Sequence, residues 1–323
     1  MCFHQMSSNK KPKRITVLGL PYFSKYLVDL INSSCFHLEA QFVDIARKKF
    51  IISRYLSLFR EIFSSDLVYR MSGFPRKKIV QFIQILNIPL VIHWVGTDVL
   101  TAKKCFQGIS KHYLNQKNII HWTDAPWLVK ELNEIRIESE FVPLPVSTVK
   151  EILLQDTPSL PEKFTILSFL SDNRLKFYGS DYIIKLVKDF PEISFLIVGS
   201  SGKFLKDKLS NIKFLGWTSD MNKVYSKSAL LVRMVKHDGY PWTIQEALAM
   251  GRYAIWNYPL IGVFQARNYQ ELYSQVNKLF ALHKEGKLTL NKQGRQYIKK
   301  ELSPQILTKQ IVDKLSKVIN SKR

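Results

Sequence analysis

Apolar residues fall into short runs along the chain, and most runs are separated by a stretch with helical character. The runs of the first half cover residues 14–20, 38–44, 66–72, 89–96, 118–124 and 140–145. Near-continuous apolar strands that alternate with helices are typical of a parallel sheet covered on both faces. The pattern therefore predicts an α/β fold rather than an all-β or all-helical one.

The same pattern restarts after residues 146–163, a polar and proline-containing stretch that we interpret as a linker. The second series of apolar runs covers residues 164–170, 193–199, 212–216, 229–235 and 252–258. We expect two doubly wound domains, an N-terminal one over 1–147 and a C-terminal one over 148–302. Such sheets bind ligands at the carboxyl ends of their strands, so two facing domains would form a cleft.

Residues 303–323 predict one C-terminal helix, which we expect to cross back to the N-terminal domain. Ser303 can serve as N-cap and Pro304 as the first helical residue. The apolar stripe has helical spacing and consists of Leu307, Ile311, Leu315 and Val318.

The charge of the chain narrows the choice of partner. It has 48 Lys and Arg against 26 Asp and Glu, a net charge of +22. Such a surplus indicates an anionic partner: nucleic acid, an anionic membrane surface or a phosphorylated substrate. The three cysteines are far apart and fit neither a disulfide framework nor a metal site, which favours a reducing cytoplasm. We see no secretory signal and no apolar run of the ~20 residues that span a bilayer.

The most informative stretch is HDGYPWTIQEALAMGRYAIW, residues 237–256. A strand ends before it, Gly239 and Pro241 indicate a turn, and a helix follows that ends at Gly251. Asp238 then lies in the loop at the carboxyl end of the strand, and Glu246 lies on the first turns of the helix. Amides at a helix start favour anions, so the arrangement suits a nucleotide-sugar site.

This stretch resembles the E-x7-E signature of retaining, family-4 glycosyltransferases of GT-B fold. Asp238 stands where the family has its first Glu, and the matching residues are Gly239, Glu246, Ala247, Ala249 and Gly251. The resemblance implies that Asp238 holds donor-sugar hydroxyls, that Glu246 holds the ribose, and that Gly239, Tyr240 and Pro241 form the loop beside them. The alternative is an ordinary helix start with solvated acids.

The resemblance also implies further site residues. On the acceptor side, Asp98 and His93 are candidate bases, with the carboxylate favoured; alternatively Asp98 caps a helix and His93 is a half-buried strand residue. For the diphosphate, Leu170 or Phe169 and Tyr178 stand where the family has Arg and Lys. The cations that remain are Arg174, Lys176, Arg233 and Lys236, and a solvated basic turn is the alternative for the first two.

Three residues complete the set of candidates. Gly19 lies in the turn after the first strand, where the family brings acceptor and diphosphate close, although a plain turn is as good an explanation. Trp217 and Thr218 lie where a loop of the family reaches the nucleobase. Core packing is the alternative for Trp217.

The implied activity is a hexosyltransferase-type glycosyltransferase of polysaccharide or glycolipid assembly. It would move a sugar from a nucleotide-diphosphate donor to a hydroxyl of a glycan or lipid-linked acceptor, with retention of configuration. We expect no cofactor and no metal. The alternatives are a nucleotide-sugar epimerase of GT-B fold and a basic nucleic-acid-binding protein. Because the charge is scattered and no nucleic-acid-binding signature appears, no nucleic acid partner is expected.

The pattern of apolar and basic residues in 47–63 bears on whether the protein binds a membrane. On a helix they present an apolar face, formed by Ile52, Tyr55, Leu56, Phe59 and Phe63. Cations flank that face, namely Arg47, Lys48, Lys49, Arg54 and Arg60, with more in residues 74–78. An apolar stripe with a basic rim suits an interfacial helix, so we expect a cytoplasmic protein that is peripheral on the inner face of the cell membrane. The alternative is that the stripe packs on the sheet.

Overall fold

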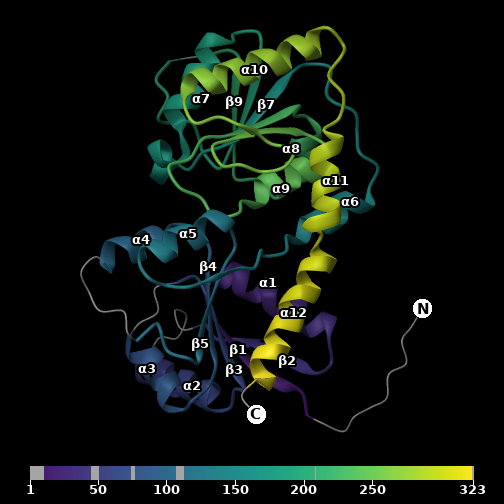
Figure 1. Ribbon diagram of the computed structural model, residues 1–323. Coiled ribbons are helices and arrows are strands. Elements are labelled where there is room, and N and C mark those ends of the chain that lie inside the picture. Colours follow the sequence, from purple (N-terminus) through teal and green to yellow (C-terminus); the bar gives the residue numbers. More distant parts are fainter. Residues whose placement is uncertain (1–10, 45–50, 74–76, 107–112, 208, 322–323) are drawn as a thin grey trace. The chain divides into compact units, whose positions relative to one another are not determined.

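The computed structural model describes residues 11–44, 51–73, 77–106, 113–207 and 209–321 (Figure 1). The chain divides into two compact units, each with its own sheet. Unit 1 comprises Met1–Leu144 with Gln305–Arg323, and unit 2 comprises Pro145–Pro304. Each sheet has six strands, and every strand pair is parallel. The predicted α/β fold with two doubly wound sheets is confirmed.

The sheet of unit 1 has the strand order β2-β1-β3-β4-β5-β6. Its strands are β1 (Lys13–Gly19), β2 (Leu38–Phe42), β3 (Leu67–Met71), β4 (Leu90–Trp94), β5 (Ile119–Thr123) and β6 (Glu140–Phe141). The order reverses at β1, so the loops after β1 and β3 lie at the carboxyl edge where such sheets hold ligands. Every residue of β4 is buried because helices cover both faces of a doubly wound sheet.

Six helices accompany this sheet among the described residues. They are α1 (Pro21–Ser34), α2 (Ile51–Phe63), α3 (Lys77–Ile85), α4 (Thr97–Cys105), α5 (Pro126–Glu134) and α12 (Pro304–Asn320). In α12 the predicted stripe faces the protein, since Leu307, Ile311 and Leu315 are at most 1% exposed. Ile311 and Leu315 share a core with β1, β2 and β3. The chain thus ends in the unit in which it began.

The sheet of unit 2 has the order β12-β11-β10-β7-β8-β9. Its strands are β7 (Thr165–Phe169), β8 (Ser194–Val198), β9 (Ile212–Gly216), β10 (Leu230–Arg233), β11 (Tyr253–Trp256) and β12 (Phe264–Gln265). The helices are α6 (Ser147–Leu154), η1 (Asp172–Tyr178), α7 (Ser180–Asp189), α8 (Met221–Ser226), α9 (Trp242–Ala249), α10 (Tyr269–Lys284) and α11 (Lys292–Glu301). The order reverses between β7 and β10, which makes their two loops the expected ligand position.

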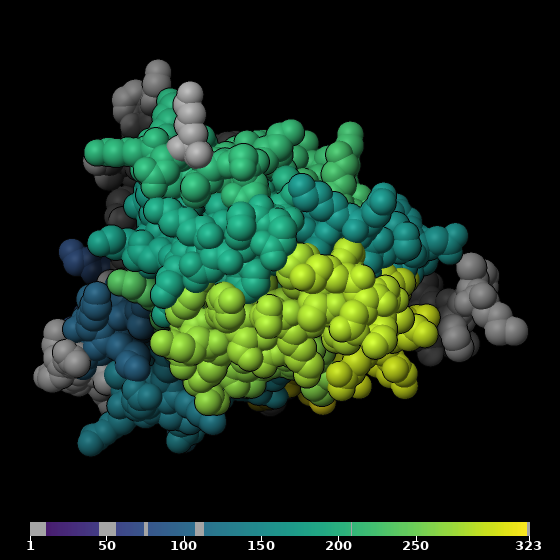
Figure 2. All heavy atoms as spheres, turned by 90° about the horizontal axis from the view of Figure 1, so that it is seen from above, coloured from purple at the N-terminus to yellow at the C-terminus, as the bar shows by residue number. Residues whose placement is uncertain are grey.

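Helices α7 and α10 lie side by side over one face of this sheet (Figures 1 and 2). Their apolar faces meet in one core with β7, β8 and β10, in which Ile183, Leu186, Leu272 and Val276 are fully buried. Toward the surface the contact is aromatic: the ring centroids of Phe190 and Tyr273 are 4.7 Å apart.

The interpretation of residues 146–163 as a linker is wrong. Residues 147–154 form α6, which packs against α9 through buried Val149 and Ile152. The segment after α6 is held by Arg252, whose side chain is fully buried and donates to the carbonyls of Pro158 (3.0 Å), Ser159 (3.0 Å) and Tyr225 (3.1 Å). Most polar residues of the segment are exposed, and their number is the reason that the short amphipathic helix was not recognised from composition.

Candidate functional site

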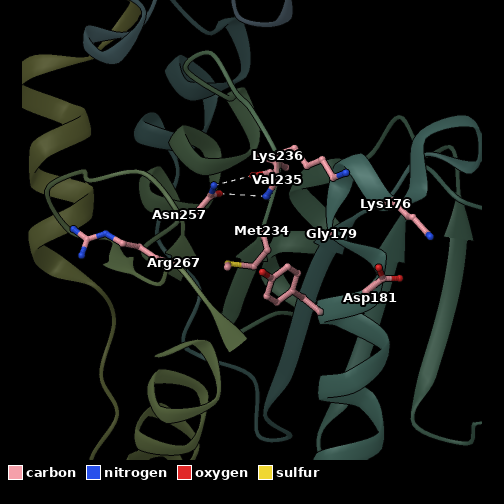
Figure 3. A pocket seen from close by; sticks show the side chains of 9 residues that line it. Lys176, Gly179, Asp181, Met234, Val235, Lys236, Asn257 and Arg267 are labelled. Atoms are coloured by element: carbon pink, nitrogen blue, oxygen red, sulfur yellow. Dashed lines mark hydrogen bonds between the residues drawn. The ribbon is translucent and has the colours of Figure 1, made fainter. Parts of the chain in front are cut away.

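A cavity of about 260 Å³ opens in unit 2 beside the loops that follow β7 and β10 (Figure 3). Three cations line it: Lys176 from η1, Lys236 from the turn after β10, and Arg267 after β12. Asp181 is the only carboxylate among its lining residues. The cavity is therefore positively charged and lies at the sheet position where ligands bind in doubly wound folds.

Backbone and side-chain bonds fix the walls of this cavity. Asn257 accepts from the N–H of Val235 (3.2 Å) and donates to its carbonyl (2.7 Å), as drawn in Figure 3. The N–H of Lys236 donates to the carbonyl of Phe177 (2.9 Å), which ties the two loops together. Gly179 starts α7 in the left-handed region with φ 71°. A loop pair held in this way is organised before a ligand arrives.

Asp238 is bound to Arg233 inside the turn after β10. Its Oδ2 accepts from Nε at 2.6 Å and its Oδ1 accepts from Nη2 at 2.9 Å, a bidentate pair. The two side chains are only 12% and 11% exposed. Sequence reasoning chose both residues but missed the pairing, which needs a turn that brings positions five apart face to face.

Glu246 lies on α9 and is 6% exposed. Its Oε2 accepts from the hydroxyl of Tyr225 at 2.6 Å, and its Oε1 accepts from Thr148 of α6. Burial raises the pKa of Glu246, and the two hydroxyl donors counteract that rise. Each carboxylate oxygen has a second lone pair, so a ribose hydroxyl can still donate to it. Nothing in the sequence indicated Tyr225 or Thr148 as partners.

The loop between the two acids leads into α9. Gly239 is buried, Tyr240 is 5% exposed with its hydroxyl 3.3 Å from that of Tyr297, and Pro241 is the residue before the helix. The side chain of Tyr240 is therefore buried in unit 2, and its role in nucleotide-sugar binding stays a prediction.

The two predicted cations on η1 differ in position. The guanidinium of Arg174 stacks over the ring of Phe177 at 3.9 Å and is not among the residues that line the cavity, whereas Lys176 lines it. Of the two residues that stand where the family has Arg, Leu170 is fully buried and Phe169 is half-buried. Of the predicted phosphate-binding cations, Lys176 and Lys236 therefore line the cavity, and Arg233 ends β10, just before the turn that holds Lys236.

Trp217 and Thr218 follow β9. Trp217 is 88% exposed, so the core-packing alternative is wrong for it. The loop beside it is ordered: the N–H of Gly199 donates to the carbonyl of Gly216 (2.7 Å), and Asp172 accepts from the N–H (3.1 Å) and hydroxyl (2.9 Å) of Ser201. An exposed indole beside a fixed loop suits stacking on a nucleobase.

The acceptor-side candidates in unit 1 are less accessible. His93 is fully rather than half buried, because β4 is covered on both faces, and its Nδ1 is bonded to the hydroxyl of Tyr69. Asp98 accepts from the N–H groups of Gly73 (2.5 Å), Val95 (3.2 Å) and Val99 (3.0 Å). The capping alternative for Asp98 is wrong, because the N-cap of α4 is Gly96 and Asp98 lies within the first turn of the helix. The role of Asp98 or His93 as a base stays a prediction.

Among the acceptor-side candidates, Gly19 occupies a position at which the backbone geometry requires glycine. Its φ is 111°, and a Cβ there would lie 1.8 Å from the carbonyl oxygen of Met71 on the neighbouring strand. The loops after β1 and β3 therefore approach each other at the carboxyl edge of unit 1.

The burial of His93 predicts an acid-sensitive unit 1. Burial lowers the pKa of His93 to about 3, and an unfolded histidine titrates near 6.5. Below pH 6.5 the unfolded chain therefore binds a proton at His93 that the folded chain does not bind. The contribution of His93 to stability is present above pH 6.5 and is lost as the pH falls toward 3. We expect a loss of about 2 kcal/mol between pH 7 and pH 5 from this residue. Urea titrations at both pH values measure it; a His93→Gln variant with the same pH slope as wild type would contradict it.

In the described part of the chain, no group of three or more His, Cys, Asp or Glu side chains is arranged to hold a metal ion. Over the same residues, no helix is both long and apolar enough to cross a membrane.

Comparison with known proteins identifies the fold. Residues 174–258, which hold the cavity loops and both acids, match the family model described as glycosyl transferases group 1. No curated protein matches the chain in sequence. Among solved structures, the chain is similar to three proteins of about its own length.

The first is HepE of Anabaena in complex with UDP and glucose, with 13% identity, a TM-score of 0.64, and coverage of 94% of this chain and 99% of that one. The second is a sucrose-phosphate synthase of Thermosynechococcus elongatus, with 11% identity, a TM-score of 0.67 and coverage of 96% and 100%. The third is a glycosyltransferase of Rickettsia africae, with 13% identity, a TM-score of 0.67 and coverage of 96% and 99%. The two sheets and their helices thus form the GT-B fold.

Proposed function

We propose that the protein is a glycosyltransferase that uses a nucleotide-diphosphate sugar, with a hexose as the transferred sugar. The observation that carries the proposal is Glu246, a buried carboxylate held by two hydroxyls, in the same segment that matches the family model and that supplies most of the lining of the positive cavity. A carboxylate in that state accepts ribose hydroxyls strongly. The HepE structures, which contain UDP or UDP-glucose, favour a uridine donor.

The chemistry required of the site is modest. The bond from the sugar to the diphosphate breaks, and negative charge develops on the phosphate oxygen that leaves. Lys176, Lys236 and Arg233 supply cations at the cavity and its adjoining turn, where they stabilise that charge. We infer that these side chains take the place of a metal ion and that configuration is retained. The acceptor is a hydroxyl of a glycan or a lipid-linked glycan.

The experiment is a panel of nucleotide sugars, first screened for protection against thermal unfolding and then incubated with glycan acceptors. We expect one donor to raise the melting temperature and to yield a product with retained anomeric configuration, with and without EDTA. Conversion of the donor to an epimer without transfer would point to an epimerase. Salt-sensitive DNA binding without any nucleotide-sugar binding would point to a nucleic-acid-binding protein.

We further propose that unit 1 rests on an anionic membrane on the cytoplasmic side. Leu56 and Phe63 of α2 are 65% and 74% exposed, and Ile85 of α3 is 81% exposed. The rings of Phe59 and Phe82 join the two helices at 4.4 Å. Leu58 and Ile62 bury the opposite side of α2. Leu56 and Phe63 therefore do not pack on the sheet, although the predicted stripe member Phe59 is half-buried.

Exposed cations accompany these apolar side chains, namely Arg60, Lys77 and Lys78. Residues 45–50 and 74–76 and the side chains of 51–55, which hold other members of the predicted face and rim, lie outside the described part. Each Lys or Arg at an anionic lipid surface contributes about 1 kcal/mol.

Co-sedimentation with vesicles tests the membrane proposal. We expect binding to phosphatidylglycerol vesicles at low salt, much weaker binding to phosphatidylcholine vesicles, and a severalfold loss on Leu56→Ser with Phe63→Ser. The control is Leu154→Ser, an exposed leucine of α6 in unit 2. Equal binding to both lipids, or a double variant that binds like wild type, would refute it.

A further inference from the structure

The pair of Arg233 and Asp238 lies at the point where the strand order of unit 2 reverses. Arg233 is the last residue of β10, the strand beside β7, and its guanidinium lies 5.7 Å from the ring centroid of Tyr178 in the loop after β7. The guanidinium is therefore placed by both loops of the ligand-binding edge. A cation fixed in this way loses little conformational freedom when an anion binds to it.

The hydrogen bonds within the pair determine which N–H donors of Arg233 remain for a ligand. Both oxygens of Asp238 accept from Arg233. On the guanidinium, these bonds use the edge formed by Nε and Nη2 and leave Nη1 and the second N–H of Nη2. No other hydrogen bond from Arg233 occurs among the described residues. Arg233 thus keeps N–H donors that a ligand can use, and both oxygens of Asp238 serve to orient it.

Electrostatics keep the pair intact. Burial by itself would lower the pKa of Arg233, but the charge and hydrogen bonds of Asp238, together with Tyr178 and Tyr225, outweigh that effect and raise the pKa above its ordinary value. The pair has no net charge, and the nearby cavity adds Lys176, Lys236 and Arg267 against Asp181. A diphosphate bound there meets an overall positive environment in spite of Asp238.

We propose that Arg233 binds the diphosphate of the donor and that Asp238 is its positioning residue, acting through Arg233 rather than on the donor sugar. The inference rests on the proposed function. It assigns a role to Asp238 that differs from the one the sequence resemblance implies, because each oxygen of this carboxylate already accepts a charge-assisted bond from the guanidinium, which fixes the orientation of Arg233.

The test is calorimetric binding of UDP, GDP and ADP, and of the matching nucleoside, to wild type and variants. We expect Arg233→Gln and Asp238→Asn each to weaken nucleoside diphosphate binding by about tenfold or more, with nucleoside affinity unchanged. Arg233→Lys should not restore affinity, because an ammonium lacks the planar fork. The matched control is Asp207→Asn, which breaks an exposed ion pair with Lys188 in the same unit and should bind like wild type.

The double variant Arg233→Gln with Asp238→Asn separates the two roles, and it removes both charges so that neither is left buried alone. If Asp238 acts through Arg233, the double variant has the same diphosphate affinity and turnover as Arg233→Gln. A further drop in turnover, or an Asp238→Asn variant that binds diphosphate like wild type, would overturn the inference. A wild-type protein that binds none of the three nucleoside diphosphates would instead overturn the proposed function.

Discussion

Replacing Glu246 by Gln is expected to weaken binding of the donor nucleotide, and of its free nucleoside, by about 10- to 100-fold. The neutral amide loses the charge that strengthens a hydrogen bond from ribose, which contributes about 1.5–3 kcal/mol. The amide NH₂ also faces a hydroxyl that now donates to a carboxylate oxygen. Calorimetry with the nucleoside isolates this effect, because the nucleoside carries no phosphate.

The same substitution should not destabilise the fold, since burial already disfavours the ionised form of Glu246 and raises its pKa, and the facing hydroxyl can rotate to accept from the new amide. Urea denaturation should show an unfolding free energy equal to or above that of wild type. Glu192→Gln makes the same chemical change at an exposed position of unit 2 and serves as the control. If Glu246→Gln binds nucleoside like wild type, Glu246 does not hold the ribose.

The second large effect is expected from Gly179→Ala. Gly179 and Gly286 lie in the same unit with nearly equal φ values, 71° and 67°. A Cβ at Gly179 would lie 1.9 Å from the carbonyl oxygen of Met234, whereas nothing lies within 4 Å of a Cβ at Gly286. Gly286→Ala should therefore cost only the left-handed backbone penalty of about 1–2 kcal/mol.

Gly179→Ala should cost about 3–5 kcal/mol, because the same penalty is joined by a backbone clash that moves β10 away from α7. Since Gly179 and Met234 both line the cavity, binding of a nucleotide sugar should fall as well. Paired urea denaturation curves measure the difference between the two variants. Equal costs would show that the loops after β7 and β10 are free to move apart.

Much of the fold could be predicted from the sequence because its strands are buried on both faces and appear as continuous apolar runs. All six runs of the first half and all five of the second correspond to strands. The exceptions are short. Strand β12 has two residues, and α6 has eight, with polar positions outward, so neither carries a pattern long enough to be recognised.

The candidate site was predictable to the extent that it depends on local chain geometry. A strand, a glycine turn and a helix place Asp238 and Glu246, and their positions follow from the turn residues between them. What each carboxylate contacts depends on elements far away in the sequence. The side chains of Tyr225 on α8 and Thr148 on α6 reach Glu246 only through tertiary packing. The roles of both acids stay predictions until binding is measured.

The full burial of His93 also depends on tertiary packing, so it could not be predicted from the sequence. A histidine at the end of an apolar strand has the same local sequence whether it faces a cleft or a core. Only the helices packed on β4, together with the hydroxyl of Tyr69, decide that it lies inside.

The contact between Thr148 and Glu246 also determines how this chain can be divided or recombined. Thr148 lies 98 positions before Glu246, close to the boundary at which unit 2 begins. A fragment that starts at β7 would retain the whole sheet and the signature helix. It would nevertheless lack one of the two hydroxyls on Glu246 and the carbonyls of Pro158 and Ser159 that Arg252 binds. Chimaeras that exchange the nucleotide-binding half with a relative should therefore cross over before α6, so that this helix is inherited with the carboxylate it holds.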